Sequence, residues 1–527
     1  MHDGAYASVN LPLHHWAYDA IERLTAMGVI DRAMVVAKPY SRKQAATYVA
    51  RAMQRIRSDE VEIDGREAVA EPLLDRLMKE LGPELVSLGA VDPPREAKAG
   101  TPMVRYGARL QVQGDAFSVG HGTVRLRENS MGQYYANGEQ VQSDLRAWFE
   151  LTDALAVSVN PKYISNVNAL GLGATSNEKN VYMQEFNAKV TAANIALQIG
   201  RGSLWWGPGY RGSLLLTDHA FPLDMIQLGS DESFKLPGVF KSLGDWKVNT
   251  FLTQLERDRD FPRANVFGAR LSYLPASWLE LGFTRLTQFG GRGRNQSFPK
   301  AVIEAYGQQP NQSGAKEVNE QVMVDFRARI PRVDYLVPFP AGMQFYGEMG
   351  SEDKWSKVPL PSRAAVLGGI YIPQVFQDDS LDLRIEYADT DLTRRKTGDS
   401  LAGTWYNNGT YTSGMRTRGF ALGHWMGTDG IDLFIRTTRY LTEGVQLGVN
   451  MDFSERARGQ AVHERKREWG MDLTWWSSSR AQFTVGYAYQ RIANPGQITR
   501  INPFAETFSN GVASNNHLLS TNMAVQF

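Results

Sequence analysis

The side chains best suited to bind a polar ligand are concentrated in residues 200–216, which read GRGSLWWGPGYRGSLLL, and close beside them. Aromatic rings stack on the C–H faces of sugars, and polar side chains exchange hydrogen bonds with sugar hydroxyls. Both kinds are present here, as Trp205, Trp206 and Tyr210 (rings) and Arg201, Arg211, Asp218 and His219 (polar partners). We treat these residues as a candidate carbohydrate site. The alternative is that the two tryptophans pack inside a plug or join an aromatic girdle at a membrane interface.

The backbone of this segment suits neither a helix nor a strand, because its glycines and its proline interrupt both. We therefore expect a loop that begins an excursion from Ser203 to about Gly244. The elements around that loop must decide between the two interpretations.

The sequence contains little evidence for a catalytic site or a metal site. The chain has no cysteine, which excludes disulfides, thiolate metal sites and c-type haem attachment. Its eight histidines show no metal-ligand spacing, and no Ser–His–Asp arrangement can be inferred. The net charge of +1 gives no case for nucleic acid. We predict a protein that is not an enzyme and has no cofactor or metal. A spatial cluster of nucleophile and base leaves no trace in sequence, so an outer-membrane hydrolase stays an alternative.

From Val104 onward the sequence alternates between apolar and polar residues, the period of a β-strand. Such alternation fits a soluble sandwich, with its apolar face inward, or an outer-membrane barrel, with its apolar face toward lipid. Ionised residues recur in mid-strand on the polar face, which suits a water-filled lumen: Asp325, Arg327, Asp382, Arg384 and Glu386. The strands reach the length that a tilted membrane strand needs. The alternating C-terminus HLLSTNMAVQF ends in an aromatic residue, Phe527, which resembles the insertion signal of bacterial outer-membrane barrels.

The predicted fold is therefore mainly β: a transmembrane antiparallel barrel of about 18 strands, with an uncertainty of about two. No apolar run is long enough for a spanning helix. The alternation of short turns and long loops fails near residues 275–315 and 392–440, where strands are missed or wrongly joined. The predicted strands are 104–114, 143–152, 155–163, 179–193, 195–202, 246–256, 265–275, 279–287, 320–331, 341–350, 362–373, 380–391, 415–425, 431–440, 444–455, 467–476, 481–493 and 515–527.

The N-terminal residues have helical rather than strand periodicity. We divide the chain into a helical periplasmic domain (1–90), a linker (91–103) and the barrel (104–527). Ser41 is the expected N-cap of the second helix. HWAYDAIERLTAMGVID and KPYSRKQAATYVARAM together resemble a single S-layer homology module, a family that binds cell-wall polymers. That resemblance implies contact with peptidoglycan or export machinery through Trp16, Ser41 and Arg42; a helical plug or cap is the alternative.

Two longer segments resemble the Wzi-type capsule assembly family. They are NIALQIGRGSLWWGPGYRGSLLLTDHAFPLDMIQL, residues 194–228, and TWYNNGTYTSGMRTRGFALGHWMGTDG, residues 404–430. The resemblance implies an eighteen-stranded outer-membrane barrel of a Gram-negative-type bacterium, with a lectin-like, non-catalytic role in organising surface polysaccharide. It adds Tyr406, Arg418 and His424 to the candidate glycan contacts, and outer-membrane lipid and lipopolysaccharide to the expected surroundings.

Three further functions remain as alternatives to polysaccharide binding. A channel for solute or polysaccharide export requires an open lumen, a hydrolase requires a nucleophile within reach of a base, and a scaffold has no role in sugar binding. The long loops at 203–245, 290–315, 392–414 and 494–514 indicate an occluded pore. Occlusion favours binding over transport.

Overall fold

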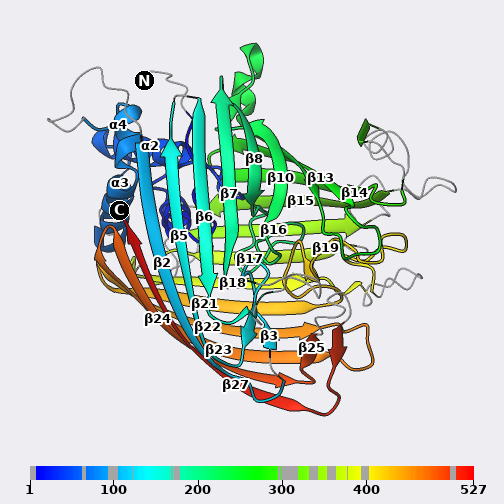
Figure 1. The fold of residues 1–527 in the computed structure, drawn as a ribbon. Coiled ribbons are helices and arrows are strands. Elements are labelled where there is room, and N and C mark those ends of the chain that lie inside the picture. Colours follow the sequence, from blue (N-terminus) through cyan, green and yellow to red (C-terminus); the bar gives the residue numbers. More distant parts are fainter. Residues whose placement is uncertain are drawn as a thin grey trace.

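The computed structural model shows a large barrel with helices at one end (Figure 1). The structure describes residues 7–61, 67–92, 105–122, 124–152, 154–167, 170, 179–294, 298–299, 318–330, 342–352, 364–376, 378–392, 403–498 and 506–527.

Eighteen strands of the described chain close the barrel, and every neighbouring pair is antiparallel. Closure occurs where β27 pairs with β2. The barrel strands are β2 (Arg105–Ser118), β5 (Gly138–Glu150), β6 (Leu155–Ile164), β7 (Val181–Ala192), β8 (Ile195–Gly202), β10 (Leu223–Ser230), β12 (Asp245–Gln254), β13 (Asn265–Ala276), β14 (Leu279–Phe289), β15 (Val318–Ile330), β16 (Met343–Glu352), β17 (Ala365–Ile372), β18 (Leu381–Asp389), β21 (Ile431–Thr442), β22 (Val445–Arg456), β23 (Glu464–Ser478), β24 (Ala481–Ala493) and β27 (Ala513–Gln526).

The predicted fold class and strand number are confirmed, although two local predictions are wrong and cancel in the count. Residues 415–425 form no barrel strand: they contain only the two-residue strands β19 (Arg416–Thr417) and β20 (Phe420–Ala421), which pair with each other. Conversely, β10 lies in the middle of the predicted excursion 203–244 and pairs with β8 and β12. The alternation in 415–425 arises from packing in the barrel interior, where apolar side chains are also buried.

The barrel exposes its apolar side chains and buries its charged ones. Val485 and Leu519 face outward and are 51% and 49% exposed. Inside, Arg270 on β13 and Asp325 on β15 form a fully buried ion pair of 2.7 Å. The predicted lumenal charges at mid-strand are likewise buried, which confirms their inward orientation. This arrangement is the reverse of a soluble sandwich and is that of a barrel surrounded by lipid.

Four helices precede the barrel: α1 (Ala17–Ala26), α2 (Arg42–Arg57), α3 (Glu67–Glu80) and α4 (Gly82–Ser87). The Ser41 hydroxyl accepts a hydrogen bond of 3.1 Å from the Gln44 amide, so Ser41 caps α2 as predicted. Their apolar faces form a common buried core. No helix in the described ranges is long and apolar enough to cross a bilayer. Most of the predicted linker, 91–103, lies outside the described residues.

We call the end of the barrel that holds these helices the helix end, and the opposite one the loop end. Figure 1 shows α2, α3 and α4 at one end and the short strands β3 and β25 at the other. Ion pairs connect the helices to lumenal residues of the wall, including Arg23 to Asp382 at 3.0 Å and Arg384 to Glu22 at 3.2 Å. The remaining short elements are β1 (Ala37–Lys38), β3 (Val124–Leu126), β4 (Tyr134–Ala136), β9 (Trp205–Trp206), β11 (Phe234–Lys235), β25 (Gly496–Ile498), β26 (Glu506–Phe508) and a 3-10 helix (Gly238–Leu243).

Candidate functional site

The aromatic loop between β8 and β10, residues 203–222, folds back into the lumen. Its strand β9 pairs with β1 of the N-terminal segment, with Trp206 opposite Ala37. Trp206 is 3% exposed and packs edge-on against Phe251 of the wall, with 5.4 Å between ring centroids. The indole N–H of Trp205 donates to the carbonyl of Gly209 at 3.1 Å. Both tryptophans therefore occupy the plug position that the sequence left as an alternative.

Two glutamates of the barrel wall hold the backbone of this loop. Glu348 accepts hydrogen bonds from the amides of Gly209 (3.1 Å) and Leu214 (2.7 Å). Glu386 accepts hydrogen bonds from the amides of the intervening residues Tyr210 (2.6 Å) and Arg211 (2.8 Å). Because the partners are backbone amides, the chain must approach the wall closely, which its glycines permit.

Gly207 shows most clearly that the loop backbone must lie close to the wall. Its φ is +153°, and a Cβ at this position would lie 2.2 Å from a carboxylate oxygen of Glu348. No side chain fits there without displacing the wall contact. The irregular backbone of the loop is thus a condition for seating it against charged wall residues.

The second family-like segment packs on the first inside the lumen. The hydroxyl of Tyr406 donates to the carbonyl of Leu214 at 2.5 Å and accepts from the His424 amide at 2.7 Å. Both side chains are fully buried. Burial lowers the pKa of His424 to about 3, so its ring is neutral. Tyr406 and His424, predicted as glycan contacts, connect the two lumenal loops and form the plug with them.

Three other candidates border a water-accessible space in the lumen, which we call the inner cavity. It has a volume of about 420 Å³ and is bordered by Tyr210, Arg211 and Asp218 of the loop. Arg211 pairs with Asp452 of the wall at 2.6 Å. The carboxylate of Asp218 lies 2.7 Å from Nε2 of His14 in the N-terminal segment. Burial lowers the pKa of His14, but the carboxylate outweighs this effect, so the pKa is raised.

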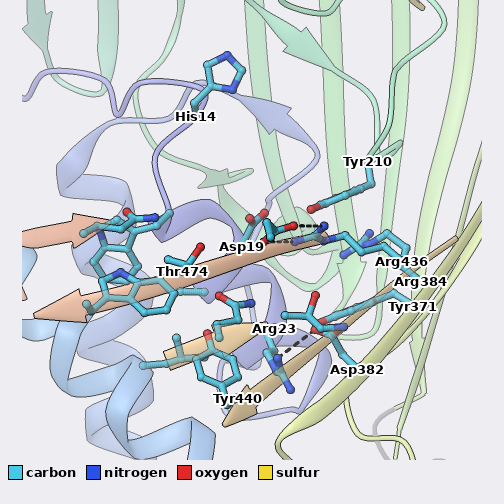
Figure 2. A pocket seen from close by; sticks show the side chains of 18 residues that line it. His14, Asp19, Arg23, Tyr210, Tyr371, Asp382, Arg384, Arg436, Tyr440 and Thr474 are labelled. Carbon is cyan, nitrogen blue, oxygen red and sulfur yellow. Dashed lines mark hydrogen bonds and ion pairs between the residues drawn. The ribbon is translucent and has the colours of Figure 1, made fainter. Parts of the chain in front are cut away.

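A second cavity of about 210 Å³ adjoins the inner cavity and shares Tyr210, His14 and Asp19 with it. Figure 2 shows its wall, in which the guanidinium of Arg384 lies near the rings of Tyr210 and Tyr371, each 4.2 Å away. Its arginines are paired with acids, as described for Arg384 with Glu22. The cavity is lined mainly by polar and aromatic side chains of the wall and the helices.

Arg201 and Arg418 lie apart from the other candidates, near the loop-end rim. Arg201 pairs with Asp224 through two hydrogen bonds of 2.7 and 2.8 Å. The guanidinium of Arg418 lies 3.9 Å from the centroid of the Phe221 ring. Burial lowers the pKa of Arg418, and the nearby Arg201 adds to this effect. The sequence-predicted residues therefore divide among the plug core, the inner cavity and the rim.

The loop end contains a separate pocket of about 350 Å³, which we call the outer pocket. Sequence reasoning found only one of its residues, His219. Many of the others lie in the second family-like segment, 404–430, although different residues of that segment were predicted as contacts. The rest, such as Gln460 and Phe508, come from loops far apart in the sequence and belong to no motif. Aromatic and polar side chains of the outer pocket include Tyr134, Asn407, Arg416, Phe420, Trp425, Asp429, Arg456, Gln460 and Phe508.

Several polar atoms around the outer pocket have no hydrogen-bond partner among the described residues. They are Nδ1 of His219, Nε1 of Trp425 and Oδ1 of Asp429. Burial raises the pKa of Asp429 to about 6 and lowers that of His219 to about 3. Buried polar groups normally find partners, so these three unpartnered atoms are exceptions among the residues around the outer pocket.

The N-terminal candidates have structural contacts. Arg42 is buried and forms ion pairs of 2.6 Å with both Glu80 and Glu84, which raise its pKa despite burial. Ser41 is the buried helix cap described above, and Trp16 borders the cavity of Figure 2. A cell-wall role for these residues stays a prediction. No group of potential ligands that could hold a metal ion occurs in the described part of the chain.

An apolar exterior, a charged interior, loops folded into the lumen and helices at one end define a plugged β-barrel of the outer-membrane type. The sequence model of the capsule assembly protein Wzi family matches residues 111–500, and the chain belongs to this family.

The chain is also similar to individual proteins. An uncharacterized 55.8 kDa protein of the cps region of Klebsiella pneumoniae is 29% identical over 196 residues, which span 37% of each chain. The structure of Wzi from Escherichia coli, an outer-membrane protein involved in group 1 capsule assembly and a carbohydrate-binding β-barrel, matches with a TM-score of 0.67 and 17% identity. The match covers 97% of this chain and 98% of that one. OpdQ of Pseudomonas aeruginosa matches with a TM-score of 0.44 and 11% identity, over 80% of this chain and 98% of that one.

Proposed function

We propose that this protein is an outer-membrane barrel that binds capsular or exopolysaccharide at the cell surface without transforming it, and that the outer pocket is where it does so. Family membership and the carbohydrate binding of the Escherichia coli relative support the proposal. The observation that carries it is the outer pocket itself, which lies among the loops at the end opposite the helices.

The chemistry of the outer pocket matches a sugar. Among its rings, Phe508 is partly exposed and offers an apolar surface, and its polar side chains, among them Asn407 and Gln460, can exchange hydrogen bonds with hydroxyls. A volume of about 350 Å³ lies at the lower end of the range of small-ligand pockets. One or a few sugar residues of a longer polymer would fit, and the rest of the polymer would lie across the loops.

Calorimetric titration of the purified protein in detergent with capsular oligosaccharides tests this proposal. The probe variant is Gln460→Ala, because Gln460 lines the outer pocket and is exposed. Gln54→Ala on the exposed face of α2 is the matched control. We expect affinity to fall by roughly 5- to 10-fold in the probe variant, the effect of one lost hydrogen bond, and to be unchanged in the control. Equal affinities in both variants, with wild-type binding intact, would place the glycan elsewhere.

The channel alternative receives less support. The inward-folded loops and the N-terminal segment meet in the lumen, where β1 pairs with β9. Planar-bilayer recording separates the two functions: a polysaccharide-binding barrel with a seated plug gives no steady current. Large steady unitary currents from the wild-type protein would favour transport.

The proposal also assigns the two ends of the barrel to different compartments. With the outer pocket at the cell surface, the helices face the periplasm, in keeping with the resemblance of their sequence to an S-layer homology module. Peptidoglycan or export machinery would then meet the exposed face of α2, which includes Arg51 and Gln54, rather than the buried Ser41 and Arg42. Sedimentation of the protein with purified peptidoglycan, with and without Arg51→Ala, tests such contact.

A further inference from the structure

Two arginines on the lipid-facing surface lie directly opposite each other near the loop end. On β23 and β24 the odd-numbered residues point outward, as the exposure of Met471 and Val485 demonstrates. Arg467 and Arg491 belong to this face and are cross-strand partners in the register. Both are exposed. Like charges placed directly opposite on a sheet destabilise it unless an anion compensates them.

No side chain in the described ranges compensates this pair. Their other neighbours in register are Phe453 on β22 and Asn515 on β27, which are neutral. Neither guanidinium makes an ion pair or side-chain hydrogen bond with the part of the chain that the structure describes.

Other arginines on the outer surface of the same rim are paired. Arg201 contacts Asp224 at 2.7 Å, and Arg285 contacts Glu320 at 2.6 Å. Arg465, two residues before Arg467 in the sequence, lies 3.5 Å from Glu455. Arg467 and Arg491 differ from these three arginines because neither has an acidic partner among the described residues.

The height of the pair on the barrel indicates what it meets. The next outward residues toward the helix end form an aromatic row, in which Trp469 stacks on Tyr489 at 5.9 Å and Tyr489 contacts His517 at 5.2 Å. Below the row the surface is apolar. Aromatic rows of this kind lie at the boundary between hydrocarbon and headgroups. The two arginines, one step beyond the row, therefore lie at headgroup level.

We propose that Arg467 and Arg491 form a binding site for the phosphate groups of a phosphorylated, acylated glycolipid in the outer leaflet. Guanidinium groups bind phosphate oxygens through paired, charge-assisted hydrogen bonds. The sugar of the headgroup would lie against Trp469 and Tyr489, and its acyl chains along the apolar surface below. The site rests on the outer-membrane placement proposed above but is independent of the outer pocket, because it is on the exterior of the barrel.

Native mass spectrometry of the detergent-solubilised protein tests the site, with diphosphorylated lipid A as the probe. The double variant Arg467→Gln/Arg491→Gln is compared with Arg439→Gln, in which an outward arginine near the helix end is neutralised. We expect the double variant to retain at least about 10-fold less lipid A, because two charge-assisted contacts are lost, and the control to retain as much as the wild type. Dephosphorylated lipid A should bind weakly to all three.

Equal retention of lipid A by the double variant and the wild type would overturn the proposal. So would an acidic oligosaccharide without acyl chains that binds the wild type as tightly as lipid A does and is lost in the double variant, because the partner would then be a surface polysaccharide. Heat-modifiable migration on gels confirms that each variant is folded. Titration of the same preparations with capsular oligosaccharide reports on the outer pocket, so failure of one proposal is separable from failure of the other.

Discussion

Replacing Trp206 with alanine should unseat the plug. The ring is 3% exposed, and it belongs to the buried cluster that connects the loop to the wall. A buried Trp→Ala change costs about 3–5 kcal/mol, from lost burial and the cavity left behind. If the barrel itself is unaffected, this cost falls on the equilibrium between the seated and the displaced loop. At about 1.4 kcal/mol per tenfold change, the displaced population should rise by roughly 100- to 5,000-fold.

Single-channel recording in planar bilayers measures this population as the fraction of time spent in a conducting state. The matched control is Trp278→Ala, because Trp278 is 52% exposed in the turn between β13 and β14. We expect frequent openings for Trp206→Ala and wild-type behaviour for the control. Heat-modifiable migration on gels verifies that both barrels are assembled.

The result also decides between the two interpretations of the tryptophan pair. Were Trp205 and Trp206 sugar platforms, the double alanine variant would loosen surface polysaccharide and leave conductance unchanged. A folded Trp206→Ala barrel that remains as closed as the wild type would refute the argument that this ring seats the plug.

Two further predictions concern the plug and the outer pocket. Gly207→Ala should lower the thermal midpoint of unfolding measured by circular dichroism, because the added Cβ would collide with Glu348. The control is Gly409→Ala, whose Cβ would have no heavy atom within 4 Å and which should leave the midpoint unchanged. Equal midpoints for the two variants would contradict the close approach of Gly207 to the wall. Burial raises the pKa of Asp429 to about 6, above the value of about 4 in an unfolded chain. Between these values the folded protein holds a proton that the unfolded chain has lost, so the free energy of unfolding should fall as pH rises from about 4 to about 6 and then level off. Denaturant titrations across this range should lose that component in Asp429→Asn, and an unchanged profile would show that the carboxyl is not responsible.

Sequence periodicity predicted the barrel because its cause is local: a strand between lipid and lumen must alternate at every step. The same rule explains the correct orientation of Asp325 and Arg384. It failed for β10, which follows an irregular loop without a clear turn, and for 415–425, where alternation reflects burial inside the lumen. The alternation of apolar and polar residues alone does not distinguish an apolar side chain that faces lipid from one that is buried inside the lumen.

The candidate site was harder to predict because it depends on how loops fold. The motif residues Trp206, Tyr406 and His424 lie in two recognisable segments, yet they are buried in the plug. Residues of the outer pocket such as Phe508 and Gln460 come from separate loops and carry no motif. Their proximity follows from strand pairing, because β22 and β24 flank β23 and end at the same rim.

The outer pocket and the plug share residues, because His219 belongs to the aromatic loop and Phe420 and Trp425 belong to the second lumenal segment. Ion pairs such as Arg23 with Asp382 and Arg211 with Asp452 join the plug to the wall in the interior, where removal of one partner would leave an uncompensated buried charge. Such pairs make displacement of the plug costly even though the lumen contains water-accessible cavities. A polymer bound in the outer pocket as proposed would therefore rest on a plug that these pairs hold in place. Variants that unseat the plug, such as Trp206→Ala, should then change both conductance and glycan affinity, whereas Gln460→Ala, outside the two plug segments, should change glycan affinity alone.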